Sequence, residues 1–181
     1  MKIIAFLGNP GKQYGRNRHN AGFIVGEYFC NKHSINPTQK KFRSFTATSS
    51  VNGTDVCLLF PQTYMNNSGK AVIEAMKFYK EKPTNVIIVH DEIELPFGKI
   101  AIKFGGGHKG QNGLRSIIQH LGTPDFTRLR FGVGRPENPQ IEVAEYVLGN
   151  FFPEELKRVI DEFLPAAATL LEQEIAAEHD K

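Results

Sequence analysis

Two unbroken apolar runs stand out along the chain and predict the buried strands of a sheet. The segment KIIAFLG at residues 2–8 leads into a turn-forming Asn-Pro-Gly sequence, and the segment NVIIVHDE at residues 85–92 ends on His-Asp-Glu. Short apolar runs bounded by turn signals are typical of central strands that other elements cover on both faces. Both runs therefore predict central strands.

The remaining segments predict further strands that alternate with helices. The dipeptide Asn52-Gly53 separates two β-rich runs and is a strong signal for a hairpin. The segments KIAIKF at 99–104 and TRLRFGV at 127–133 alternate between apolar and polar residues, as strands with one buried face do. Apolar residues at helical spacing predict five helices, which start near Asn20, after Ser68, at Leu114, near residue 141 and at Pro153. Ser68 is the predicted N-cap of the second helix, which Pro83 ends, and Pro165 is expected to bend the last one.

Strands that alternate with helices indicate an α/β fold, a three-layer sandwich whose mixed, mostly parallel twisted sheet is flanked by helices. The 181 residues, 40% of them hydrophobic and 23% charged, suit one globular domain over 1–181, with a helical part from about 150 to 181. No apolar run is long enough to span a membrane, and the run at 3–7 is too short for a signal peptide. We therefore expect a cytoplasmic protein, in which Cys30 and Cys57 are buried thiols.

The ends of the two buried strands carry candidate catalytic groups. In α/β sheets the reactive groups gather beyond the carboxyl ends of the strands. The loop after the first strand carries Asn9, Tyr14 and His19, and the second strand ends near Asp91. If the strands are neighbours, His19 and Asp91 meet at one rim, where the carboxylate orients the imidazole and leaves its other nitrogen basic. The alternative is that His19 only begins a helix and Asp91 only caps a loop.

The sequence offers no partner nucleophile for this pair. It lacks a G-x-S-x-G motif, and Cys57 lies within a strand with no histidine near it in the pattern. A histidine and a carboxylate alone indicate water activated by a general base, which is sufficient for an ester. A metal site is the rival interpretation, but the histidines follow none of the spacings that are typical of zinc ligands, so no metal is expected.

Asparagines are numerous near the same rim, at positions 9, 66, 67 and 112. Carboxamides donate and accept hydrogen bonds without carrying charge, which suits them to hold a peptide main chain or to stabilise an oxyanion. Turn and cap formation is the alternative, and it is the better explanation for Asn67, which directly precedes Ser68.

Positive charge is concentrated on one face of two predicted strands. Lys99 and Lys103 share one face of KIAIKF, Arg128 and Arg130 share one face of TRLRFGV, and the apolar residues take the opposite faces. The net charge of the chain is only +3, but such a patch predicts salt-dependent contacts with nucleic-acid phosphates. A plain solvated face is the alternative.

The segment GGGHKGQNG at 105–113 has two interpretations. Gly105, Gly107 and Gly110 match the G-x-G-x-x-G spacing of a dinucleotide loop, which would make the protein an oxidoreductase. That motif, however, follows a buried strand and precedes an acidic strand end about 20 residues on, and neither feature is present here. A non-catalytic RNA-binding module is a third hypothesis, which explains the basic faces and leaves His19 idle.

Four segments together resemble the bacterial-type peptidyl-tRNA hydrolases. They are FLGNPGKQYGRNRHNAGF at 6–23, PQTYMNNSG at 61–69, VHDEIELPFGKIAIKFGGGHKGQNGLRSI at 89–117 and FTRLRFGVGRP at 126–136. They span most of the chain in order, and only the part from about residue 150 resembles the family loosely. The resemblance implies the fold of that family and an enzyme that cleaves the ester between a peptide and the 3′ ribose of tRNA without a cofactor.

The resemblance also implies a role for each candidate residue. His19 would activate water with the support of Asp91, and Asn9 would recognise the blocked amino group of peptidyl-tRNA. The remaining candidates would bind the tRNA–peptide junction (Tyr14, Tyr64, Asn66 and Asn112) or tRNA phosphates (Lys103 and Arg130). The C-terminal helices would help to clamp the acceptor arm, and the protein would act as a monomer without an obligate protein partner.

The chain departs from the usual pattern of that family at four positions. Lys109 stands where a glycine is common, Gln111 and Arg135 stand where histidines are common, and Tyr64 stands where a phenylalanine is frequent. An accessory role for a histidine at position 111 therefore does not carry over. Lys109 is expected to add a phosphate contact instead.

Overall fold

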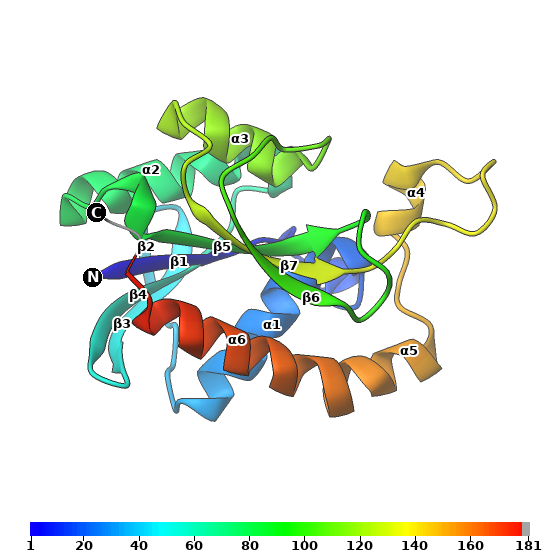
Figure 1. Ribbon diagram of the computed structural model, residues 1–181, viewed down its shortest axis with the longest axis horizontal. Coiled ribbons are helices and arrows are strands. Elements are labelled where there is room, and N and C mark those ends of the chain that lie inside the picture. The colour runs from blue at the N-terminus through cyan, green and yellow to red at the C-terminus, as the bar shows by residue number, and fades with distance from the viewer. Residues whose placement is uncertain (179–181) are drawn as a thin grey trace.

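The computed structural model describes residues 1–178, which form a seven-stranded sheet in the order β2-β3-β4-β1-β5-β7-β6 (Figure 1). Parallel pairings join the central strands β4, β1, β5 and β7, and antiparallel pairings add β3 and β2 at one edge and β6 at the other. The strands are β1 Lys2–Phe6, β2 Gln39–Lys41, β3 Ser44–Val51, β4 Thr54–Pro61, β5 Val86–Glu92, β6 Ile100–Phe104 and β7 Thr127–Gly132.

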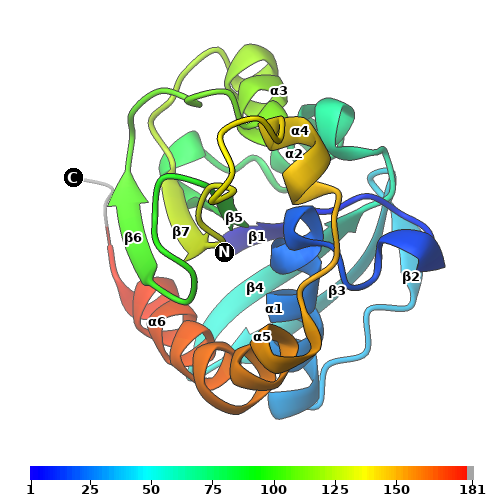
Figure 2. The ribbon, with the colours of Figure 1, turned by 90° about the vertical axis from the view of Figure 1, so that its right-hand side faces the viewer.

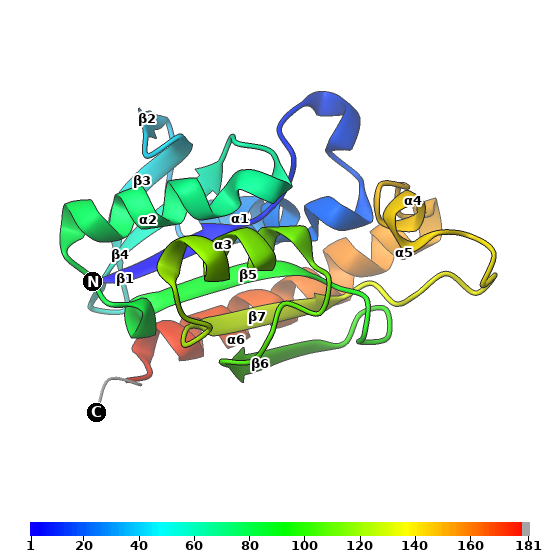
Figure 3. The same ribbon diagram turned by 90° about the horizontal axis from the view of Figure 1, so that it is seen from above.

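Helices cover both faces of the sheet, so the three-layer α/β sandwich expected from the sequence is confirmed. In Figure 1, α2 and α3 lie above the sheet while α1 and α6 lie below it, and Figure 3 shows the same layers from above. The α-helices are α1 Ala21–Lys32, α2 Ser68–Tyr79, α3 Asn112–Leu121, α4 Val143–Val147, α5 Pro153–Arg158 and α6 Leu164–Ala176. Among the described residues, none of these helices has the length and apolar character needed to cross a membrane.

Alternation along β1 explains why this strand is central. Ile3 and Ala5 pack into the core beneath α2 and α3, whereas Ile4 and Phe6 pack into the core on the side of α1 and α6. Since both faces of the strand are buried, the sequence must be apolar at every position. The unbroken runs in β1 and β5 therefore reflect two cores separated by one layer of backbone.

The predicted hairpin and the predicted helix cap had different outcomes. Asn52 and Gly53 both take positive φ angles, 50° and 87°, as a tight two-residue hairpin turn requires. Ser68, in contrast, is not the cap of α2: it is the first helical residue, and its hydroxyl donates to the Met65 carbonyl at 2.8 Å. The helix ends at Tyr79 with Lys80 in a left-handed conformation, before Pro83 is reached.

The prediction that Arg128 is presented as a cation on the outer face of the sheet was wrong. Its side chain is only 1% exposed, and its guanidinium donates to the carbonyls of Gly106, Gly107 and Pro124. The chain before and after α3 folds over this part of β7 and supplies those carbonyls. Arg128 therefore holds the glycine-rich loop in place instead of facing solvent.

The C-terminal segment continues as one bent helical run. A single π-helical turn at Val159–Phe163 joins α5 to α6, and Pro165 lies in the first turn of α6, where its missing N–H is tolerated. Val159, Leu164 and Leu171 are buried in the core on the α1 side of the sheet. The last three residues of the predicted 150–181 segment lie outside the described residues.

Candidate active site

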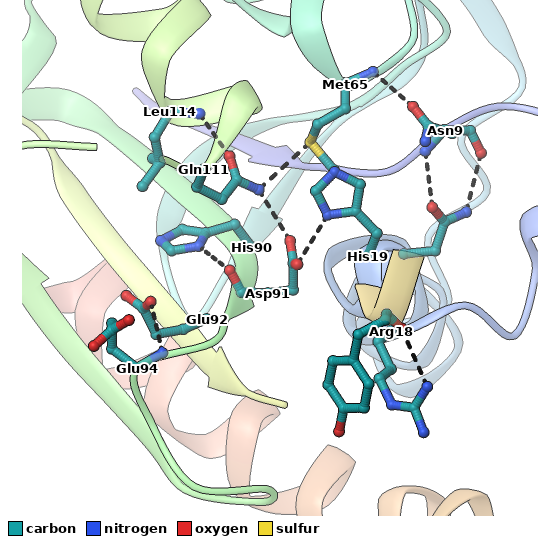
Figure 4. Close-up of polar contacts among 12 residues, drawn as sticks. Asn9, Arg18, His19, Met65, His90, Asp91, Glu92, Glu94, Gln111 and Leu114 are labelled. Carbon is teal, nitrogen blue, oxygen red and sulfur yellow. Dashed lines mark hydrogen bonds and ion pairs between the residues drawn. The ribbon is translucent and has the colours of Figure 1, made fainter. Parts of the chain in front are cut away.

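The predicted pairing of His19 with Asp91 is present at the rim where the parallel strands β1 and β5 end. His19 lies in a 3-10 turn, Arg18–Asn20, that leads directly into α1. Its Nδ1 lies 2.8 Å from Asp91 Oδ2 (Figure 4). A carboxylate only accepts hydrogen bonds, so Nδ1 carries the proton and donates it, which leaves Nε2 as the basic nitrogen. No described residue is hydrogen-bonded to Nε2.

The environment of this pair raises the pKa of His19 above its ordinary value. His19 is 9% exposed and Asp91 only 2%. Burial by itself would lower the pKa of the imidazole, but the negative charge of Asp91 and its hydrogen bond together outweigh that effect. The arrangement therefore stabilises an imidazolium, which is the form that a general base reaches after it has taken a proton.

Asn9 is held beside this pair by contacts that the sequence did not suggest. The side chain of Asn20 bonds both the N–H of Asn9, at 2.9 Å, and its carbonyl, at 3.0 Å. The side-chain oxygen of Asn9 accepts the backbone N–H of Met65 at 2.7 Å. The amide nitrogen of Asn9 has no partner among the described residues, so it is available to donate to a ligand. Asn20, next to His19 in sequence, was not among the predicted site residues.

Gln111 was also missed as a contact of the pair. Its side-chain nitrogen donates to Asp91 Oδ1 at 2.9 Å, and its side-chain oxygen accepts the N–H of Leu114 at 2.8 Å (Figure 4). The second contact makes Gln111 the N-cap of α3. Glutamine is not among the residues favoured at helix N-caps, so the sequence pattern gave no signal for this role.

The 3-10 turn that carries His19 is tied to the C-terminal part of the chain. Arg18 is 4% exposed; its guanidinium lies 4.1 Å from the centre of the Tyr146 ring and bonds Glu155 at 3.3 Å. The neighbouring Asn17 side chain donates to Asn150 at 2.6 Å. Figure 2 shows α4 and the segment leading to α5 in front of this part of the chain. The position of His19 is thus coupled to the segment from α4 to α5.

The other predicted junction residues lie at the surface near this rim, without hydrogen bonds to the pair. Tyr14 is half-buried in a 3-10 turn, Lys12–Tyr14. Tyr64 is 53% exposed and has a φ of 59°, a conformation that costs about 1 kcal/mol or more for a residue other than glycine. Asn66 and Asn112 are both exposed, and Asn112 accepts a hydrogen bond from Arg115 at 3.3 Å.

A groove of about 780 Å³ begins at Asn9 and Asn20 and runs along α1. Its apolar lining includes Phe23, Ile24 and Phe60. The groove therefore offers an apolar surface that is continuous with the polar groups at the rim.

Lys103 and Arg130 lie on the α3 side of the sheet, at its β6–β7 edge. Together with Lys109, they line a small cavity that also contacts His90 and Glu92. Partial burial lowers the pKa of Lys103, and so do the nearby charges of Lys109, Arg130 and Arg128. These cations repel one another, although Glu92 and Glu94, which line the same cavity, partly offset their charge. Among the described residues, no group of three or more histidine, cysteine, aspartate or glutamate side chains is arranged to hold a metal ion.

The glycine-rich loop at 105–113 lacks the surroundings of a dinucleotide site. It follows β6, an edge strand that pairs antiparallel to β7 and is only half-buried. Gly105, Gly106 and Gly110 take positive φ angles, and Lys109 does so too, at 47°, in the position where a glycine would be relaxed. The dinucleotide-binding loop instead follows a buried parallel strand and opens a helix, so the fold does not support that interpretation.

A histidine oriented by a buried carboxylate, with carboxamides beside it at the rim of an α/β sheet, is an arrangement of the kind that hydrolases use for acid–base chemistry. A sequence model of the peptidyl-tRNA hydrolase family matches residues 3–181. The peptidyl-tRNA hydrolase of Syntrophotalea carbinolica is 44% identical over 176 residues, which cover 96% of this chain and 92% of that protein. That of Trichlorobacter lovleyi is 47% identical over 174 residues, which cover 94% of this chain and 89% of that protein.

The fold agrees with these sequence relationships. The crystal structure of the peptidyl-tRNA hydrolase from Acinetobacter baumannii superimposes with a TM-score of 0.82 at 37% identity, over 98% of this chain and 95% of that one. The chain therefore belongs to the peptidyl-tRNA hydrolase family, which is a family of enzymes. The resemblance found in the four sequence segments is confirmed.

Proposed function

We propose that this protein hydrolyses the ester bond between a peptide and the 3′ ribose of tRNA, so that free tRNA and peptide are released from peptidyl-tRNA. The observation that carries the proposal is the 2.8 Å contact between His19 and Asp91, with the basic nitrogen of His19 left unpartnered. Membership of the peptidyl-tRNA hydrolase family supports the choice of substrate.

In the first step, His19 Nε2 takes a proton from a water molecule while the water oxygen attacks the ester carbonyl carbon. The carbonyl π electrons move to oxygen and form a tetrahedral oxyanion. Asp91 stabilises the imidazolium that results, because its carboxylate keeps the Nδ1 proton between the two groups. A positioned base of this kind contributes a factor of about 10²–10⁴ to the rate.

In the second step the oxyanion collapses and the bond to the ribose 3′ oxygen breaks. The imidazolium of His19 returns its proton to that oxygen, which leaves as a hydroxyl group on tRNA. The peptide keeps the oxygen of water as part of a new carboxylic acid, which then releases its remaining proton to solvent and becomes a carboxylate. An ester has a far better leaving group than an amide, so one base suffices without a covalent intermediate or a metal.

Carboxamides recognise the groups around the ester. The unpartnered amide nitrogen of Asn9 donates to the carbonyl oxygen of the acyl group on the last amino acid, an acceptor that a free amino group lacks. Asn66 and Asn112, with Tyr14 and Tyr64, bind the tRNA–peptide junction. The apolar groove beside Asn9 accepts the peptide, and its lining allows side chains of many kinds.

Positive charge and the C-terminal segment bind the tRNA. Lys103 and Arg130 contact phosphates of the acceptor arm, and the segment from about residue 150 helps to hold that arm as part of the same domain. Phosphate contacts position the substrate without reading its sequence, which suits an enzyme that must accept many tRNAs. No second subunit is needed to complete this site, so we propose that the protein acts as a monomer.

The decisive experiment compares the hydrolysis of N-acetylated and free aminoacyl-tRNA by the native protein and by His19→Ala. The native protein is expected to hydrolyse only the blocked substrate at a substantial rate, and His19→Ala is expected to lose about 10²–10⁴-fold in kcat while it still binds tRNA. His120→Ala, which changes an exposed histidine on α3, is the matched control and should be unaffected. Binding without hydrolysis by the native protein would favour an RNA-binding module instead.

A further inference from the structure

Gln111 has a position that neither the fold nor the proposed mechanism explains by itself. Its half-buried side chain spans the start of α3 and the carboxylate of Asp91. It also lies 3.5 Å from the sulfur of Met65. Room for this side chain depends on Gly113, because a Cβ atom there would lie 3.0 Å from the Gln111 oxygen and 2.7 Å from the Met65 sulfur.

The orientation of the Gln111 carboxamide is fixed by its helix contact. The N–H of Leu114 is a donor, so the group that faces it must be the oxygen of Gln111. The side-chain nitrogen then faces Asp91 and must donate. Reversal of the amide would place two donors together at Leu114 and two acceptors together at Asp91.

Each oxygen of Asp91 therefore has one side-chain donor. Oδ2 accepts from His19 and Oδ1 accepts from Gln111. Two donors at fixed points determine the plane of the carboxylate, and the plane decides whether Oδ2 points at the imidazole. A carboxylate with a single partner could rotate about its Cβ–Cγ bond and lose that alignment.

We infer that Gln111 is a positioning residue: it holds the Asp91 carboxylate in the plane that orients His19. The inference rests on the proposed function and deepens it. A carboxamide neither gains nor loses a proton over the working range of pH, unlike the histidine that is common at this position in the family. In this chain, the carboxylate that orients His19 therefore has a hydrogen-bond partner, Gln111, whose charge does not change with pH.

Two substitutions separate this role from the helix cap. Gln111→Ser keeps a good N-cap but cannot reach Asp91. Gln111→Glu is nearly isosteric and can still accept the Leu114 N–H, but it presents an acceptor where Asp91 needs a donor. Gln111→Ala removes both contacts and shows what the loss of the cap costs.

The experiment measures kcat, KM and the pH profile of kcat on N-acetylated aminoacyl-tRNA, together with the thermal midpoint of each variant. We expect Gln111→Ser to keep the thermal midpoint and KM but to lose about 10-fold in kcat, as the loss of one hydrogen bond to a charged group implies. Gln111→Glu should lose more and should move the acidic limb of the profile to higher pH, because added negative charge favours the imidazolium.

The inference fails if Gln111→Ser and Gln111→Glu keep native kcat and an unshifted pH profile, because Gln111 would then act only as a helix cap. If Gln111→Ser does not fold, Gln111→Glu decides the matter, since it retains the cap. Failure of the proposed function is distinguishable, because the native protein would then not hydrolyse the blocked substrate at all.

Discussion

Asp91 contacts one histidine on each side of β5, and the two histidines differ in their partner and in the direction of their pKa shift (Figure 4). His19 pairs with the Asp91 carboxylate, and its pKa is raised. His90 donates its Nδ1 proton to the backbone carbonyl of Asp91 at 2.7 Å, and its pKa is lowered. Both imidazoles are largely buried, so burial does not separate them.

The difference lies in what balances the loss of hydration. Burial lowers the pKa of His90, and the positive charge of Arg128 lowers it further; the hydrogen bond to the Asp91 carbonyl and the acidic neighbours are too weak to compensate. At His19, a full negative charge at hydrogen-bond distance outweighs the same cost. A carboxylate side chain thus favours the protonated form of a buried imidazole, whereas a backbone carbonyl does not offset the cost of burying its charge.

The largest expected effect tests the carboxylate. Asp91→Asn removes the charge from His19 but keeps the backbone carbonyl that His90 uses. We expect kcat for blocked aminoacyl-tRNA to fall by about 10²–10⁴-fold, because the imidazole loses its orientation and the stabilisation of its charged form. The residual activity should have its acidic limb at lower pH, since the pKa of His19 falls when Asp91 no longer raises it.

Asp55→Asn, which makes the same substitution at an exposed position on β4, is the matched control and should keep native kcat and an unmoved acidic limb. An Asp91→Asn protein with native kcat and an unmoved acidic limb would remove Asp91 from the mechanism.

A smaller effect concerns the pH dependence of stability, to which the two histidines should contribute with opposite signs. The folded-state pKa of His90 lies below the unfolded value of about 6.5, so the unfolded chain takes up the proton first and stability is lost as pH falls below about 6.5. The folded-state pKa of His19 lies above that value, so its contribution is present at low pH and is lost as pH rises through the folded pKa.

His90→Gln should therefore lower the free energy of unfolding by about 1–3 kcal/mol at pH 8, because a buried hydrogen bond is disturbed, yet it should flatten the loss of stability between pH 7 and pH 5. His19→Gln should make that acid loss steeper. Urea denaturation at several pH values measures both slopes. Equal slopes for the two variants would contradict the assignment of opposite pKa shifts.

The comparison also shows how far the sequence could predict this site. The patterns predicted two central strands with His19 and Asp91 beyond their carboxyl ends, so that the two residues would meet only if the strands were neighbours, which the pairing of β1 with β5 provides. The Gln111 contact could not be predicted, because it depends on how one side chain crosses from a loop to a neighbouring strand. Alternation placed Arg128 on the correct face of β7 but could not show that the loop at 105–110 covers it. The prediction of Ser68 as a cap was wrong because a hydroxyl can donate to a backbone carbonyl as readily as it can accept from a backbone N–H, and here it donates to Met65.

The smallest expected effect concerns the cations on the His90 side of the sheet. If Lys103 and Arg130 bind phosphates, each change to alanine removes one neutralised phosphate, so tRNA binding weakens by about tenfold or less and the slope of log K against log salt falls by about 1. Lys77→Ala, on the exposed side of α2, is the matched control. Because these cations do not contact His19, kcat at saturating substrate should stay near native. A lower kcat with an unchanged salt slope would instead mean that Lys103 and Arg130 contribute to the chemical step. The assignment of chemistry to the His19 side of β5 and of tRNA binding to the His90 side would then be wrong.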